Sequence, residues 1–569
     1  MLIKKNNWII NLLLLGLIIA LVFGLVISNQ HQEDLEINSE EQGSLLSLEY
    51  PNPEPRITLL AVGDLSFSRG VEMMMDRNDD LYYPFRQLEG FFQSADLSFA
   101  NLESPLTPGR VIQSGEMIFR GKSEMAEVLA TLGIDIVSLA NNHTPNFGEK
   151  GLKDTFNSLT DSGVLYVGAG ETDQAAYAPV YLSKSGLTLA FIAHNDSDVV
   201  PASYRASSDR AGTALMDKER LQAAILEAKE KADLIIVSLH SGTEYVPQPN
   251  SRQTDFARAA IDYGADLVIG HHPHVVQTME QYQGKYIFYS LGNFVFDQSW
   301  SQETKEGLAI ELKLSRQGVI EVYFWPVVME KLAQPRLAKS AEAEKILARL
   351  AYPLDLQPLY YWDGEKEIET VIGYLRESEE TSKEELGKLV RADLDQDGII
   401  EDYLLSAGQL QIIKEGQIIW QSPEDWQIDD FQLADINNDG VVDINLSLWK
   451  PGSFASSQPF WLAENDLRVK NHFFVLDYNQ GDPQPLWGSS NLEQANCQFI
   501  VQDLDGDGFP ELLTVEGEYQ EGTECQGKYL AIWRWNGWGF ANEWRSEAGE
   551  FKDLILKTVN QQTYFTATN

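Results

Sequence analysis

The sequence predicts a membrane-anchored protein in which an α/β domain is followed by an all-β repeat domain. Three observations lead to this prediction. Residues 8–27 are almost uniformly apolar, residues 56–330 alternate short apolar runs with helical stretches, and residues 389–569 contain one acidic turn three times. A chain of 569 residues is also longer than a single hydrophobic core usually fills.

The composition is strongly acidic, with 85 Asp and Glu residues against 43 Lys and Arg and a formal net charge of −42. Such a surface repels phosphate backbones and attracts cations, so we expect no nucleic acid among the partners. A hydrophobic fraction of 43% supports packed cores and excludes a largely disordered chain. Two cysteines without a Cys-x-x-Cys motif exclude a zinc ribbon, an iron–sulfur cluster and a disulfide framework.

The apolar stretch 8–27 has Asn11 as its only polar residue, and it is long enough to cross a hydrocarbon core of about 30 Å. Lys4 and Lys5 precede it, and no Lys or Arg follows before Arg56. The positive-inside rule therefore predicts a single-pass cell-membrane protein with the bulk of the chain outside the cytoplasm. A cleaved signal peptide is the alternative, although no A-x-A-like cleavage site follows.

On this interpretation residues 1–7 form a cytoplasmic N-terminus, and residues 28–55 form a linker. The linker is polar and acidic and ends in three prolines, which is typical of a spacer between a membrane and a domain.

Apolar runs of strand length alternate with helical stretches between residues 56 and 330, which indicates an α/β domain with buried strands. We expect strands in 57–63, 95–102, 134–140, 232–240, 265–270 and 285–296, and helices in 123–132, 148–162, 217–231 and 251–263. The loops after strand carboxyl ends build the active sites of such sheets. The runs here end in polar residues: Asp64, Asn101, Glu103, Asn141, Asn142, His143, His240, His271, His272 and His274.

Histidine and carboxylate ligands together suit a pair of divalent ions such as Mn, Fe or Zn. Two such ions about 3.5–4 Å apart can activate water and stabilise a leaving oxyanion. His272 and His274 are alternate residues and could each reach one of two adjacent ions. The plainer alternative is that residues 271–274 only form a tight proline turn and that each histidine is structural.

The motifs AVGDLSFSRG, FANLESPLT, SLANNHTPNFGEKGL, SLHSGTEY, GADLVIGHHPHVVQ and YSLGNFVFDQ resemble those of the CapA family of capsule synthesis. That family is associated with poly-γ-glutamate and belongs to the calcineurin-like metallophosphoesterase superfamily. The resemblance covers residues 56–298 and implies a metallophosphoesterase-type two-layer β core flanked by helices, with a dinuclear metal site.

The resemblance also implies roles for individual residues. Asp64 and His274 would bind one ion, and Glu103 would bridge to a second ion. The second ion would be bound by Asn142, His240 and His272, with His143 protonating the leaving group. Asn141 and His271 would lie behind the ligands. Arg69 and Arg120 are either anion-binding groups or structural ion-pair partners.

Two departures bear on activity, one from the superfamily pattern and one from the family pattern. The first motif reads Asp64-Leu65-Ser66 in place of the superfamily's Asp-x-His, a form that the CapA branch shares and that leaves one metal site poor in ligands. Asn146 stands where the family pattern has Asp, and an amide cannot stabilise a protonated His143.

The sequence therefore supports two functional hypotheses. One is a metal-dependent hydrolase that cleaves a phosphoester or amide of poly-γ-glutamate or another anionic cell-surface polymer. The other is a non-catalytic accessory subunit of an envelope-polymer synthesis or export complex, with a vestigial metal site.

Residues 331–388 read as a connecting helix over 337–350 and a poorly patterned segment. Beyond them, three turns carry oxygen ligands at positions 1, 3, 5 and 9 and Gly at position 6, which predicts Ca²⁺ binding. The proposed ligands are Asp393, Asp395, Asp397 and Glu401; Asp435, Asn437, Asp439 and Asp443; and Asp503, Asp505, Asp507 and Glu511. An EF-hand would have Glu at position 12, where this chain has Leu404, Leu446 and Thr514.

Strands and tryptophans flank each acidic turn, which favours propeller-like repeats and resembles FG-GAP and VCBS repeats. Three units are fewer than the usual minimum of about four blades. Either the segment before residue 389 supplies the fourth, or the array does not close. Cys497 and Cys525 flank the third turn, and they form either a disulfide or two free thiols.

Overall fold

The computed structural model describes residues 55–113, 115–362, 367–376, 387–452, 467–478, 482–489, 492–559 and 562–567. The predicted membrane anchor at 8–27 and nearly all of the predicted linker lie outside these residues. Among the residues described, none of the helices combines the length and the apolar character needed to cross a membrane.

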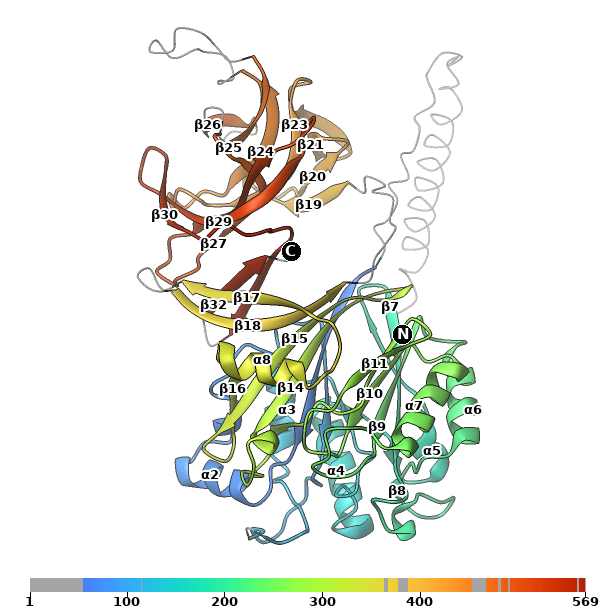
Figure 1. The fold of residues 1–569 in the computed structure, drawn as a ribbon. Coiled ribbons are helices and arrows are strands. Elements are labelled where there is room, and N and C mark those ends of the chain that lie inside the picture. The colour runs from blue at the N-terminus through green and yellow to red at the C-terminus, as the bar shows by residue number, and fades with distance from the viewer. Residues whose placement is uncertain are drawn as a thin grey trace, which may run out of the picture. The chain divides into compact units, whose positions relative to one another are not determined.

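Two β-sheets form the centre of the α/β domain (Figure 1). The larger sheet contains β1 (Ile57–Leu65), β2 (Leu97–Leu102), β3 (Ile136–Ser138), β4 (Leu165–Val167), β13 (Asn293–Val295), β14 (Glu306–Ser315), β15 (Gly318–Glu330), β16 (Gln334–Leu337), β17 (Asp355–Trp362), β18 (Glu367–Arg376), β31 (Leu554–Val559) and β32 (Gln562–Ala567). The smaller sheet contains β6 (Val180–Lys184), β7 (Leu187–Asn195), β9 (Leu234–His240), β10 (Leu267–His271), β11 (Met279–Tyr282) and β12 (Lys285–Phe288).

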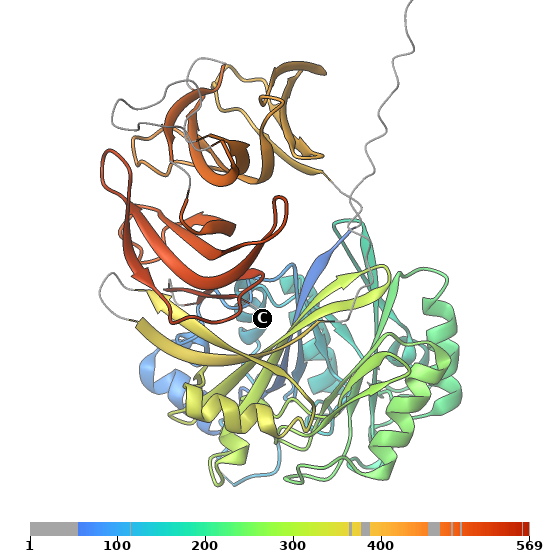
Figure 2. The ribbon, with the colours of Figure 1, turned by 45° about the horizontal axis from the view of Figure 1, so that its top comes forward.

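Helices cover the outer faces of both sheets, as Figure 2 shows from a second direction. They are α2 (Gly70–Asn78), α3 (Met125–Leu132), α4 (Gly148–Ser162), α5 (Asp173–Tyr177), α6 (Lys218–Ala228), α7 (Ser251–Tyr263) and α8 (Ser340–Ala348), with 3₁₀ turns at Tyr83–Phe85, Ala202–Tyr204 and Glu303–Lys305. A short pair, β5 (Ala169–Gly170) and β8 (Gly212–Thr213), completes the domain. The expected helices over 148–162 and 251–263 match α4 and α7 in both bounds.

One core lies between the two sheets, where apolar side chains of β1 and β14 meet those of β7, β9 and β10. Two further cores lie under the helices: one joins the larger sheet to α3 and α4, and the other joins the smaller sheet to α6 and α7. Strands covered on both faces need apolar side chains at nearly every position, which explains the continuous apolar runs in the sequence. The expected two-layer β core flanked by helices is therefore present.

Parallel pairing brings the carboxyl ends of the central strands together. In the larger sheet Asp64 on β1 is in register with Asn101 on β2. In the smaller sheet His240 on β9 lies between Asn195 on β7 and His271 on β10. The polar residues that end these runs thus gather where the two sheets meet.

The acidic turns belong to three four-stranded antiparallel sheets, and each turn joins the first two strands of its sheet. The sheets consist of β19 (Lys388–Ala392), β20 (Glu401–Ser406), β21 (Gln409–Lys414) and β22 (Gln417–Gln421); β23 (Gln427–Ala434), β24 (Asp443–Pro451), β25 (Val469–Asp477) and β26 (Gln484–Gly488); and β27 (Ala495–Gln502), β28 (Glu511–Tyr519), β29 (Cys525–Trp535) and β30 (Phe540–Arg545). Consecutive sheets share apolar cores.

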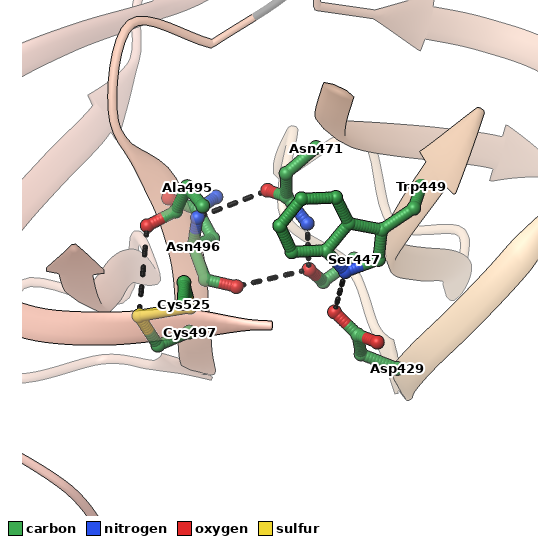
Figure 3. Close-up of a disulfide and its surroundings, with 8 residues drawn as sticks. All are labelled: Asp429, Ser447, Trp449, Asn471, Ala495, Asn496, Cys497 and Cys525. Atoms are coloured by element: carbon green, nitrogen blue, oxygen red, sulfur yellow. Dashed lines mark hydrogen bonds between the residues drawn. A yellow bond between two sulfur atoms is a disulfide. The ribbon is translucent and has the colours of Figure 1, made fainter. Parts of the chain in front are cut away.

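Cys497 on β27 and Cys525 on β29 are joined by a disulfide, with 5.7 Å between their Cα atoms (Figure 3). Polar contacts beside it join the second and third sheets. Asn496 N donates to Asn471 Oδ1 at 2.9 Å, and Ser447 Oγ donates to the Asn496 carbonyl at 3.2 Å. The disulfide therefore lies next to a hydrogen-bonded junction between two repeats.

The described part of the segment before residue 389 belongs to the larger sheet and not to a fourth repeat. Its strands β17 and β18 pair with each other, and β18 pairs with β15 of the larger sheet. The last hairpin, β31–β32, pairs with β17, so residues 554–567 also belong to that sheet rather than to the repeats. Alternating apolar residues fit an edge strand of either kind of sheet, so the sequence pattern did not distinguish them. The connecting helix is α8, shorter at each end than expected.

A buried ion pair also links the C-terminal hairpin to the α/β core. Lys557 on β31 is 3% exposed, and its Nζ lies 2.5 Å from Glu311 Oε2 on β14 and 5.4 Å from the ring centroid of Trp325. Removing one partner of a buried pair leaves the other charge uncompensated, at a cost of about 3 kcal/mol.

We predict that Lys557→Ala lowers the free energy of unfolding of the α/β domain by about 3 kcal/mol, measured by urea denaturation. Lys231→Ala is the matched control, because its pair with Glu227 is exposed and contributes less than about 0.5 kcal/mol. Equal effects of the two variants would contradict this role for the hairpin.

Candidate metal centre

Residues from five strand ends converge at the junction of the two sheets. Asp64 is the last residue but one of β1, Glu103 follows β2, His240 ends β9, and His272 and His274 follow β10. All five are buried, with at most 3% of their surface exposed. Asn142 and His143 reach the same place from the turn after β3.

Two groups of potential ligands share Glu103. In the first, His274 Nδ1 lies 3.3 Å from Asp64 Oδ2, and His274 Nε2 lies 3.8 Å from Glu103 Oε1. In the second, His240 Nε2 lies 3.7 Å from Glu103 Oε1 and 3.1 Å from His272 Nδ1. Asn142 Oδ1 is 3.0 Å from the same His240 nitrogen. The structure thus brings together the residues that the family resemblance assigns to two ions.

The donor set fits divalent cations. Glu103 Oε1 is buried and has no hydrogen-bond partner among the described residues, which is costly for a carboxylate. Two imidazole nitrogens and an amide oxygen also face one another at 3.0–3.1 Å around His240. Carboxylate, imidazole and amide oxygen together suit Mn, Fe or Zn, and a shared carboxylate suits two ions.

Burial sets the protonation of these side chains. Burial, followed by the charges of Asp64 and Glu244, raises the pKa of Glu103 well above its ordinary value. Burial lowers the pKa of His240 well below its ordinary value and lowers that of His272 to about 3. Both imidazoles are therefore neutral at physiological pH, which is the form that binds a metal.

Amide side chains hold this arrangement in place. Asn101 Nδ2 donates to Asp64 Oδ1 at 2.8 Å. Asn141 Nδ2 donates to Asn101 Oδ1 at 3.1 Å, and its Oδ1 accepts from the backbone nitrogens of His143 and Thr144. Asn141 thus fixes the turn that carries Asn142 and His143.

The turn after β10 has an unusual backbone. His272 and His274 have φ angles of 100° and 58°, in the region that favours glycine. Such residues cost of order 1–3 kcal/mol each and persist where the surroundings over-determine them, often at functional sites. His271 points elsewhere, with Nε2 3.3 Å from the Val62 carbonyl.

His143 lies beside the ligand groups and is held by Asn146. Its Nδ1 donates to Asn146 Oδ1 at 3.0 Å, and the same oxygen accepts from Phe119 N at 2.7 Å. The Phe119 ring stacks on the imidazole with 3.6 Å between centroids. Burial lowers the pKa of His143 to about 3, so the ring is neutral in this environment.

Arg69 and Arg120 are both engaged in buried ion pairs, as the structural alternative for them requires. Arg69 pairs with Asp297, and its guanidinium lies 4.3 Å from the Phe119 ring centroid. Arg120 pairs with Glu72 and donates to the Thr107 carbonyl at 3.1 Å.

Two residues near the centre were missed by the sequence analysis. Glu244 forms a ligand group with His272 and His274, and Asn293 Oδ1 lies 2.9 Å from His274 Nδ1. Both lie within motifs quoted above, SLHSGTEY and YSLGNFVFDQ. The sequence therefore shows that these motifs contain a carboxylate and an amide, but it does not show that both side chains lie near His274.

The fold and these side chains define an α/β sandwich with a candidate dinuclear metal centre. The family description "Bacterial capsule synthesis protein PGA_cap" matches residues 58–298. The PGA biosynthesis protein CapA of Bacillus subtilis is 32% identical over 293 residues, covering 51% of this chain and 76% of its own. The capsule biosynthesis protein CapA of Bacillus anthracis is 31% identical over 303 residues, covering 52% and 73%. The chain therefore belongs to this family of bacterial capsule synthesis proteins.

More distant similarities are also found. A Mycobacterium tuberculosis protein named as a probable polyglutamine synthesis accessory protein is 31% identical over 214 residues, covering 36% of this chain and 56% of its own. The calcineurin-like phosphoesterase YfkN from Bacillus subtilis covers 50% of this chain and 89% of its own at 16% identity, with a TM-score of 0.28.

We predict that the purified chain holds about two transition-metal ions when loaded with Mn²⁺, and that Glu103→Gln loses ions from both positions because Glu103 belongs to both groups. Metal content is measured by plasma mass spectrometry. His194→Gln is the control, since His194 is buried and lies outside the ligand groups found among the described residues. Unchanged metal content in Glu103→Gln would contradict a shared carboxylate.

Proposed function

We propose that the protein acts on the outer side of the cell membrane in the synthesis of poly-γ-glutamate or a related anionic polymer. Its centre would be a dinuclear metal-dependent hydrolase that cleaves a phosphoester or an amide. The observation that supports this most is the pair of ligand groups sharing Glu103, with His143 beside them. The relatives' names place those proteins in capsule and PGA biosynthesis.

When bound, two divalent ions supply Lewis acidity that polarises the scissile group and water. The chain's own residues hold the reacting groups and move the proton. His143 donates Nδ1–H to Asn146, which leaves Nε2 as the ring nitrogen that would accept a proton from water and pass it to the leaving group. Phe119 covers one face of that ring and keeps water from it.

The accessory-subunit hypothesis is the second candidate, and Asn146 favours it. Asn146 Oδ1 orients His143 but carries no charge to stabilise an imidazolium, so His143 is a weaker acid–base group than one paired with a carboxylate. A protein with this centre could bind metal and polymer without rapid turnover. The accessory role in the name of the M. tuberculosis relative agrees with this alternative.

Anchoring remains part of the proposal. The apolar segment 8–27 and the lysines before it would place the α/β domain and the repeats outside the cytoplasm, where a capsule polymer is exported. The partners would then be the membrane, an anionic polymer and its synthesis machinery.

The test is turnover of a generic phosphodiester, a phosphomonoester and poly-γ-glutamate by the Mn²⁺-loaded chain. We expect cleavage of one of them, and a fall of about 10²–10⁴-fold in kcat for His143→Ala with metal content unchanged. Metal bound without turnover would favour the accessory subunit. Turnover that is equal in His143→Ala would remove His143 from the mechanism.

The variant Asn146→Asp tests whether Asn146 is the residue that limits hydrolysis, and so distinguishes a weakened hydrolase from a non-catalytic accessory subunit. A carboxylate at the same hydrogen-bonding distance would stabilise a protonated His143, so we expect kcat to rise in this variant. Asn146→Ser serves as the control that removes the hydrogen bond without adding charge. If the wild type is inactive and Asn146→Asp is active, the centre is a hydrolase that this single residue has weakened. A kcat that does not rise in Asn146→Asp would contradict this role for Asn146.

A further inference from the structure

The three acidic turns of the repeats share one backbone design. In the first two, the opening Asp accepts from the backbone nitrogens of the fifth and sixth residues: Asp393 from Asp397 and Gly398, and Asp435 from Asp439 and Gly440. In the third, Asp503 accepts from Gly506 and Gly508. These bonds need no metal, so turn geometry alone does not identify an ion site.

The acidic residue at the ninth position is buried in every turn. Glu401 and Glu511 are 0% exposed, and Asp443 is 1% exposed. One oxygen of each glutamate accepts a backbone nitrogen, from Leu394 at 3.4 Å and from Leu504 at 2.9 Å. The second oxygen is the one whose charge must be compensated.

In the first and third turns a basic side chain compensates the charge on the second oxygen of the buried glutamate. Lys414 Nζ lies 2.7 Å from each of Asp395 Oδ2, Asp397 Oδ2 and Glu401 Oε1. Arg534 pairs with Asp505 and Asp507 at 2.6 Å and also with Glu511. The ammonium and the guanidinium therefore occupy the position where a cation would be bound. The carboxylates of these two turns converge around them.

None of the described residues supplies such a basic side chain to the middle turn. Glu511 is in register with Arg534 across β28 and β29, and the pairing of Asp402 with Ile413 puts Glu401 opposite Lys414. In the second sheet Ile444 pairs with Leu476, so the residue opposite Asp443 is Asp477. An acidic residue thus stands where the other two repeats have a base.

As a result, the buried carboxylate of Asp443 has no basic side chain beside it among the described residues. Its Oδ2 is buried and has no hydrogen-bond partner among the described residues, and no Lys or Arg there pairs with Asp435, Asp439 or Asp443. Arg534 lines a cavity next to Asn437 but is engaged with the third turn. The carboxylates of the middle turn also converge less than those of the other two, as like charges do without a counter-ion between them.

We propose that the repeats bind a single Ca²⁺ ion, in the middle turn, through Asp435, Asn437, Asp439 and Asp443 with Asp477 adding charge. The first and third turns are closed by Lys414 and Arg534 and do not need an ion. This revises the expectation of calcium in all three turns. Oxygen ligands of this number and charge suit Ca²⁺.

The first experiment counts Ca²⁺ ions on the full chain by equilibrium dialysis, with Mn²⁺ and excess Mg²⁺ present so that the strand-end site stays loaded. We expect one Ca²⁺ per chain, lost in Asp435→Asn and retained in Asp393→Asn. These variants are matched, because both residues accept the same two backbone bonds. Three ions per chain, no ion, or equal loss in both variants would overturn the proposal.

The second experiment adds a basic side chain to the middle turn in one variant and removes the basic side chain of the first turn in another. Asp477→Lys should abolish Ca²⁺ binding while the chain stays folded by circular dichroism, because it reproduces the arrangement of Lys414. Lys414→Asp should raise the count from one ion to two. Full Ca²⁺ binding by Asp477→Lys, or an unchanged count in Lys414→Asp, would show that these residues do not decide occupancy.

Discussion

The structure depends most on one electrostatic constraint: a carboxylate buried without a partner where the two sheets meet. Glu103 Oε1 is inaccessible to water and has no hydrogen bond among the described residues. The imidazoles of His240 and His274 lie 3.7–3.8 Å from it, and among the described residues no Lys or Arg forms an ion pair with it. A carboxylate in such a place is either protonated or neutralised by a cation. The ligand geometry around Glu103, with donors on both sides, favours the cation.

The rest of the α/β domain serves this arrangement. Parallel pairing of β1 with β2 and of β9 with β10 aligns these four strand ends, two in each sheet, where the sheets meet. Asn101 and Asn141 hold the carboxylates and the turn in position, and the left-handed residues of the 272–274 turn direct two imidazoles inward. The nearby basic residues Arg69 and Arg120 neutralise other carboxylates, Asp297 and Glu72, and leave the centre without a fixed positive charge. In the first and third acidic turns of the repeats, by contrast, Lys414 and Arg534 neutralise the buried carboxylates of Glu401 and Glu511.

Much of this could be predicted from the sequence, because strand-end residues are determined by local pattern. The strands before Asp64, Glu103 and His240 were expected from continuous apolar runs, and helices α4 and α7 were placed with their bounds. Long-range pairing could not be predicted. The sequence placed 554–567 in the repeats and missed Glu244 and Asn293 as neighbours of His274, since these contacts depend on how distant segments meet. The bases in two acidic turns were also invisible, because Lys414 and Arg534 reach them across a strand pair.

The central claim is that Glu103 bridges two metal ions between the strand ends of two sheets. The most direct measurement is an anomalous difference map from crystals grown with Mn²⁺, with data collected on both sides of the manganese absorption edge. The account predicts two peaks, one against Asp64 and His274 and the other against Asn142, His240 and His272, with the Glu103 carboxylate between them. No peak in the centre, or a single peak that Glu103 does not contact, would contradict it.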